Sequence, residues 1–237
     1  MSMPGTPASA PGPSGPWTPR DQTLLRTAQI MYAIEHGEYD RIDGIPVDFG
    51  LAGDYPDNRI VLAAPFEVLS FEAVGDGSYQ HDSGFFFATG QVGLAITAGA
   101  AIGRAVGNSR RRQQAAQAAT PQWHVIDQGM VHVNQFGLYL RTPTDLLEWD
   151  WESIITGRMI ERGQFAMLGE SAQGRVNYVI VSDAAELIFA FWATVRQPQH
   201  PQLAQRIWLL PEWVAHHRAH FGAQAFDFTE GRASLEQ

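Results

Sequence analysis

The stretch that decides the fold is residues 175–196, which read RVNYVIVSDAAELIFAFWATVR. Its first half places apolar side chains at every second position, at Val176, Tyr178 and Ile180. This period of two predicts a β-strand with one buried face. After Asp183 the apolar spacing becomes that of a helix, and Asp183 with Glu186 matches a helix capping box. We therefore expect a strand followed directly by a helix that ends near Arg196 and caps a sheet.

Upstream of this stretch, short strand candidates follow one another with turn residues between them. The candidates are residues 59–63, 66–74, 123–126, 130–134, 137–141, 146–149, 154–160 and 164–168. Turns are expected at residues 127–129 and 135–137, and at Gly163 and Gly174. Such a series predicts an antiparallel meander and an α+β fold, in which the C-terminal helix caps the sheet.

Composition limits the functions that the chain can have. The 237 residues are 45% hydrophobic, enough for a buried core, and carry a formal net charge of −9. This charge argues against a nucleic-acid partner, which needs a basic surface. Without cysteine there is no disulfide, thiolate zinc site, iron–sulfur cluster or cysteine nucleophile. No cofactor is expected, and we expect a cytoplasmic protein that can be peripheral to a membrane.

The chain divides into four parts. Residues 1–17 are rich in Pro, Gly, Ala and Ser and are expected to form a disordered tail. Residues 18–58 should form a helix followed by a wrapping loop, because Thr18, Pro19 and Asp21 fit a helix start and Gly37 fits its end. Residues 59–196 hold the strands and the capping helix. Residues 197–237 are expected to form a helical extension interrupted at Pro211.

An unusual segment lies between the early strand candidates. Residues 83–103 carry no charge, and a helix is expected over about residues 85–119. Small residues recur every fourth position, which is typical of a glycine zipper: Ala95, Gly99, Gly103 and Gly107. The arginines that follow suit anionic headgroups: Arg104, Arg110, Arg111 and Arg112. Membrane spanning, peripheral membrane contact, and association within the protein or with a like subunit all remain open.

Two groups of polar residues suggest chemistry only weakly. Glu212, His216 and His220 recur every fourth residue and are a weak candidate metal site, and a solvated helix face explains them better. Four carboxylates surround Trp149 and Trp151 in the pattern of a glycosidase pair: Asp145, Glu148, Asp150 and Glu152. Strand alternation explains them better, with the tryptophans on one face and the acids in water. No complete catalytic set is present.

The region 59–196 resembles the bacterial PH-like and GRAM-like domains. The resemblance rests on the strand Gly129-Met-Val-His-Val133, a polar turn, a second strand Gly137-Leu-Tyr-Leu140, and the single helix that follows the last strand. The segment 191–208 is also similar to the tail of actinobacterial proteins of this type. The resemblance implies a small, partly open barrel that binds lipids, peptides or proteins without catalysis, with the zipper helix inserted between its first two strands.

We therefore expect a non-catalytic binding module. Its inserted helix is predicted to engage an anionic membrane surface, or a protein partner such as a like subunit. Two alternatives remain: a structural subunit of a larger assembly, and a metal-dependent enzyme that uses the Glu212, His216 and His220 face.

Overall fold

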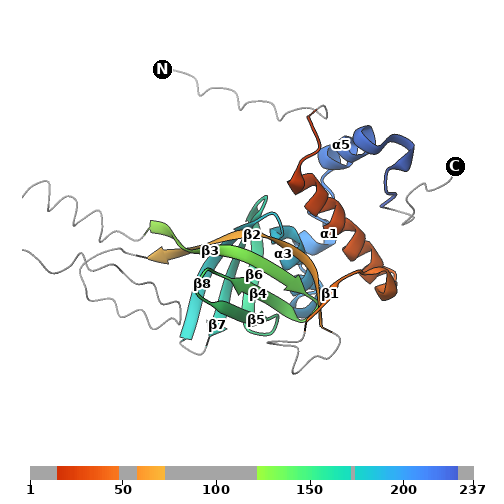
Figure 1. The fold of residues 1–237 in the computed structure, drawn as a ribbon. Helices are drawn as coiled ribbons and strands as arrows, with labels where there is room; N and C mark the ends of the chain where they lie inside the picture. Colours follow the sequence, from red (N-terminus) through yellow and green to blue (C-terminus); the bar gives the residue numbers. More distant parts are fainter. Residues whose placement is uncertain (1–14, 48–57, 73–121, 172–173, 229–237) are drawn as a thin grey trace, which may run out of the picture.

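The fold is α+β, with one antiparallel sheet of eight strands and helices gathered at one end (Figure 1). The computed structural model describes residues 15–47, 58–72, 122–171 and 174–228. The strands are β1 (Ile45–Pro46), β2 (Arg59–Glu72), β3 (Gln122–Asn134), β4 (Gly137–Arg141), β5 (Leu146–Asp150), β6 (Ile154–Glu161), β7 (Gln164–Ser171) and β8 (Gly174–Ser182).

Seven strands follow the order β5-β4-β3-β2-β8-β7-β6, and β1 pairs with the start of β2. All pairings are antiparallel. The two edge strands, β5 and β6, follow one another in the chain but are not neighbours in the sheet, so the sheet is not closed. An antiparallel, non-closed sheet is therefore confirmed, and the strands predicted from residue 137 onward end within three residues of their observed ends.

The first two predicted pairs of strands are wrong, because each pair is one long strand. Pro65 lies inside β2, opposite Met130, where a break was expected. The turn expected at residues 127–129 is paired strand, and a β-bulge lies just before it: Val68 pairs with Asp127 and Leu69 with Val125, so Ile126 has no partner in β2. Gly129 is required for another reason, because a Cβ there would collide with the carbonyl oxygen of Arg141.

Helix α3 (Ala185–Arg196) fills the open sheet as predicted. Every residue from 185 to 193 is buried, and the indole Nε1 of Trp192 donates to the carbonyl of Ile154 at 2.9 Å. The expected capping box is wrong, since the N-cap is Ala184 and makes no side-chain hydrogen bond. The Oγ of Ser182 accepts from the Ala184 N–H instead, at 3.1 Å, and Glu186 turns inward to other partners.

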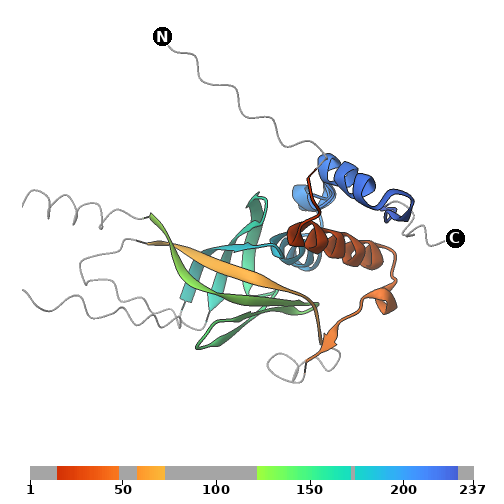
Figure 2. The same ribbon diagram turned by 45° about the horizontal axis from the view of Figure 1, so that its top comes forward.

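The remaining helices stack on α3 from the side away from the sheet. Helix α1 (Pro19–Glu35) begins with the predicted capping box of Thr18 and Asp21. Figures 1 and 2 show α1 between α3 and α5 (Pro211–Phe221), and a short α4 (Pro201–Ala204) precedes the predicted break at Pro211. The segment predicted as a loop over 40–58 contains a 3-10 turn, η1 (Tyr39–Arg41), and β1; η3 (Gly222–Gln224) follows α5.

Four predicted features fall wholly or partly outside the described residues, among them the wrapping loop (residues 48–57) and the C-terminal extension (residues 229–237). The zipper helix over residues 85–119 is one of them; its segment joins β2 to β3, whose last partners are Glu72 and Gln122. The tail is another, but its last residue, Trp17, is described and lies on α5. No helix in the described part of the chain is both long and apolar enough to cross a membrane.

Candidate functional site

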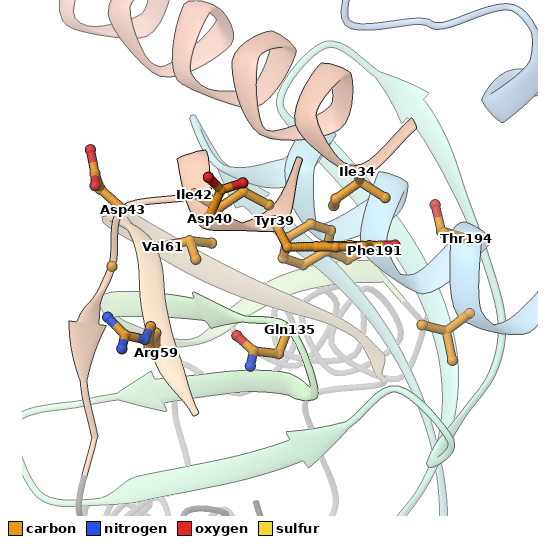
Figure 3. Close-up of a pocket in the computed structure, with 12 residues that line it drawn as sticks. Ile34, Tyr39, Asp40, Ile42, Asp43, Arg59, Val61, Gln135, Phe191 and Thr194 are labelled. Atoms are coloured by element: carbon orange, nitrogen blue, oxygen red, sulfur yellow. The ribbon is translucent and has the colours of Figure 1, made fainter. Parts of the chain in front are cut away.

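A cavity of about 790 Å3 opens where the end of α1, η1, the start of β2 and the end of α3 meet (Figure 3). Its lining comes from five separate parts of the chain: Ile34, Tyr39, Asp40, Ile42, Asp43, Gly44, Arg59, Val61, Gln135, Phe191, Thr194 and Val195. The volume is within the range of small-molecule sites.

The cavity has an apolar floor and an exposed rim. Val61 and Phe191 are buried at its base, and Ile34 and Ile42 are half-buried. Tyr39 and Val195 are large apolar side chains that remain 65% and 53% exposed at the mouth. Exposed apolar groups around an apolar hollow indicate a binding surface more than a stability feature.

Local sequence explains how the acidic side of the rim is placed. Gly37, at a φ of 70°, turns the chain out of α1, and the Ile42 N–H donates to the Tyr39 carbonyl at 3.1 Å to close η1. A Cβ on Gly44 would lie 2.9 Å from the Cβ of Arg59, so only glycine lets this segment pass so close to β2. Asp43 is thereby held beside the start of β2.

Charges of both signs stand on the rim. Figure 3 shows Asp40 and Asp43 above Val61 and Arg59 below it, with the Asp43 carboxylate pointing away from the apolar side chains. Within the described residues none of these three side chains forms an ion pair. The rim therefore offers a guanidinium and two carboxylates to a ligand.

A smaller hollow of about 130 Å3 lies between α1, α3 and α5, next to Glu186. The Glu186 side chain is only 3% exposed, and its Oε1 accepts from Arg20 at 2.6 Å and from the Gly163 N–H at 2.9 Å. In the part of the chain that the structure describes, its Oε2 has no hydrogen-bond partner. Burial raises the pKa of Glu186, and Arg20 opposes that rise. This cluster joins helices, so we assign it a structural role.

The predicted zipper and arginine residues cannot be placed. Ala95, Gly99, Gly103, Arg104, Gly107, Arg110, Arg111 and Arg112 all lie outside the described residues.

The candidate metal ligands on α5 have other contacts. Glu212 pairs with Arg162, while His216 and His220 stack on Trp17 with ring centroids 5.5 and 4.9 Å apart. Among the described residues, no three His, Cys, Asp or Glu side chains are grouped so that they could hold a metal ion. His217, which the sequence pattern left aside, is buried between Trp213 and Phe228.

The carboxylates around the tryptophans follow the predicted alternation. Trp149 and Trp151 are 6% and 2% exposed, whereas Glu148 and Glu152 are exposed to solvent. Asp150 caps the next turn, since its Oδ1 accepts from the N–H of Ser153 at 2.6 Å. These acids therefore have structural or solvent-facing positions.

Comparison with known families, curated proteins and solved structures gave no match to this chain. The candidate site therefore rests on its geometry. Sequence reasoning missed it because Tyr39, Asp40 and Asp43 lie in a segment without periodicity, and nothing local signals that this segment meets α3. The Asp43-Gly44 dipeptide marks a turn in the sequence but does not indicate a binding site.

Proposed function

We propose that the chain is a non-catalytic binding module of the PH-like kind, with the cavity between α1 and α3 as its ligand site. The architecture supports this proposal, because the sheet is antiparallel and open and helix α3, which directly follows its last strand, fills it. This is the arrangement that the sequence resemblance implies.

The cavity itself is the observation that carries the proposal. Its floor holds Val61 and Phe191, and its mouth keeps Tyr39 and Val195 exposed. Water in such an apolar hollow is displaced favourably by an apolar group, at about 25 cal/mol per Å2 of surface removed from water. The cavity therefore suits a ligand with an apolar portion.

Titration with the fluorescent probe 1-anilinonaphthalene-8-sulfonate tests the proposal. We expect saturable binding to the native protein, weakened about tenfold by Val195→Asp, which places a charge at the mouth without changing the core. Ile155→Asp is the matched control, since Ile155 is an exposed apolar residue on β6 outside the cavity lining. Absence of saturable binding, or equal loss in both variants, would overturn the proposal.

Contact with a membrane surface or a like subunit through residues 83–112 is the second candidate. Phe71 and Trp123, at the paired ends of β2 and β3, are 51% and 45% exposed, and their ring centroids are 5.4 Å apart. Figure 1 shows that these ends project beyond the neighbouring strands. An exposed aromatic pair where residues 73–121 begin and end favours an apolar contact at this place.

Flotation with neutral and anionic liposomes at low and high salt tests the second candidate, together with the mass in solution by light scattering. We expect Gly103→Leu or Trp123→Ser to abolish either salt-sensitive flotation on anionic vesicles or a soluble oligomer. Met130→Ser, on an exposed residue farther along β3, should change neither. A monomer that never floats would exclude this candidate.

A further inference from the structure

We propose that the cavity between α1 and α3 selects a zwitterionic amphiphile, an apolar chain whose polar end joins an organic cation to an anion such as phosphate. This inference rests on the proposed function and names the ligand class for the same site. It follows from the charges, the aromatic side chain and the apolar floor taken together.

The balance of charge on the rim excludes a ligand of one sign. A purely anionic ligand would face Arg59 but also the Asp40 carboxylate, with Asp43 on the outer rim, and a purely cationic one would face the guanidinium. None of the three is neutralised by an ion pair within the described part of the chain. A ligand that carries both signs matches both sides of the rim.

On the acidic side an aromatic ring joins the carboxylates. Tyr39 lies next to Asp40 in η1 and is 65% exposed, so its ring is open to a ligand. Aromatic faces attract quaternary ammonium groups, and nearby carboxylates add to that attraction. This side of the cavity therefore suits an alkylammonium group.

On the opposite side of the rim, Arg59 supplies a positive charge for the anionic group of the ligand. Its guanidinium presents a planar set of N–H donors that matches the oxygens of phosphate or carboxylate. Arg59 is the first residue of β2, and the close approach of Gly44 to its Cβ fixes the base of the side chain on the cavity wall.

The apolar floor and the sheet pairing favour an amphiphile over a peptide. Ile34, Val61 and Phe191 offer an alkyl chain a surface without hydrogen-bonding demands. An extended peptide usually adds to a free strand edge, but the start of β2, which lines the cavity, already pairs with β1 and β3.

The test compares four probes that share a dodecyl chain, each below its micelle concentration, by isothermal titration calorimetry. The probes are dodecylphosphocholine, dodecyl phosphate, dodecyltrimethylammonium and dodecyl maltoside. We expect dodecylphosphocholine to bind about tenfold more tightly than each of the others, because it alone meets both sides of the rim.

Charge variants test which rim residues bind the phosphate of dodecylphosphocholine and which bind its choline group. Arg59→Gln should weaken dodecylphosphocholine about tenfold, as should the double variant Asp40→Asn with Asp43→Asn, and neither should change dodecyl maltoside. Arg175→Gln and Glu148→Gln, at exposed positions on β8 and β5, are the matched controls. Flotation with phosphatidylcholine vesicles tests whether the natural ligand is a membrane lipid or a soluble molecule. If the protein floats with the vesicles, the ligand is a membrane lipid. If it binds dodecylphosphocholine tightly but does not float, the ligand is a soluble molecule.

Two failures are distinguishable. Equal affinity for all four probes, unaffected by the charge variants, would overturn the zwitterion and leave an apolar binding site in place. If neither these probes nor 1-anilinonaphthalene-8-sulfonate binds, both the zwitterionic ligand and the proposed function are wrong.

Discussion

The guanidinium of Arg20 on α1 lies 2.6 Å from the carboxylate of Glu186 on α3, measured from Nη2 to Oε1. This ion pair fixes the N-terminal helix to the helix that fills the open sheet, and Asp183 adds a second contact to Arg20 at 3.1 Å. Because α1 leads directly into η1, the same pair positions one wall of the candidate ligand site.

Removing Arg20 should destabilise the fold strongly. Glu186 is 3% exposed and Arg20 is 29% exposed, so Arg20→Met leaves a buried carboxylate without its cation. We expect a loss of about 2–3 kcal/mol in the free energy of unfolding, measured by urea denaturation. Arg162→Met is the control, because its pair with Glu212 is more than half exposed on both sides and should cost less than about 1 kcal/mol. Equal losses would show that burial of Glu186 does not require Arg20.

His217 should make stability depend on pH in the mildly acidic range. Burial, with Arg218 as a lesser cause, holds the pKa of His217 below its usual value of 6.5, and its Nδ1 has no hydrogen-bond partner among the described residues. The folded state therefore binds the proton more weakly than the unfolded state, and stability present above pH 6.5 is lost as the pH falls through the folded pKa.

His217→Phe should remove this acid loss, because phenylalanine fits among Trp213, Phe221 and Phe228 and does not titrate. Unfolding free energies between pH 7 and pH 5 measure the effect. Phe228→Leu changes the same cluster but keeps the histidine, so its pH profile should retain the wild-type slope. An unchanged slope in His217→Phe would assign the pH dependence to other groups.

The strands from β4 to β8 could be predicted because their signals are local. Alternation predicted β8, and Gly163 and Gly174, both at positive φ, mark the turns that were expected. Pro65 and Gly129 misled the prediction for a physical reason: inside a long paired ribbon, contacts across strands decide whether a breaker residue ends a strand. The same applies to Glu186, which fits a capping box locally but finds Arg20 more than 160 residues away.

The candidate site was beyond prediction because no stretch of sequence contains it. Tyr39, Arg59 and Phe191 come together only when α1 docks on α3, and that docking depends on long-range contacts such as Arg20 with Glu186. The α5 residues show that a local motif need not form a site. Glu212, His216 and His220 do share a helix, yet the helix is used to hold Trp17 and Arg162.

Gly129 was expected in a turn but lies inside β3, and its substitution tests whether the contact between β3 and β4 requires glycine. A Cβ at this position would collide with the Arg141 carbonyl and lie 3.1 Å from the Cα of Thr142, both of which are backbone atoms that cannot turn aside. Gly129→Ala should therefore cost about 1–3 kcal/mol in thermal or urea unfolding. Gly15→Ala, where no atom lies within 4 Å of the added Cβ, should stay within about 0.5 kcal/mol. A neutral Gly129→Ala would mean that β4 moves away freely.

Gln202 protects an edge of the sheet. From α4, its Oε1 accepts from the Met159 N–H at 3.0 Å and its Nε2 donates to the Met159 carbonyl at 2.8 Å, so the side chain imitates a neighbouring strand along β6. Gln202→Leu should leave both backbone groups unpaired and cost about 1–2 kcal/mol in unfolding free energy.

The same variant should also associate through the opened edge, since free strand edges pair with other chains. Light scattering as a function of concentration measures this, with Gln164→Leu as the control because the Gln164 Nε2 donates to an exposed carboxylate, that of Glu161, at 3.4 Å. Gln202→Leu should gain mass with concentration relative to wild type, and the control should not. A variant that loses stability but keeps the wild-type mass would show that α4 covers the edge without this side chain, and would limit Gln202 to a structural role.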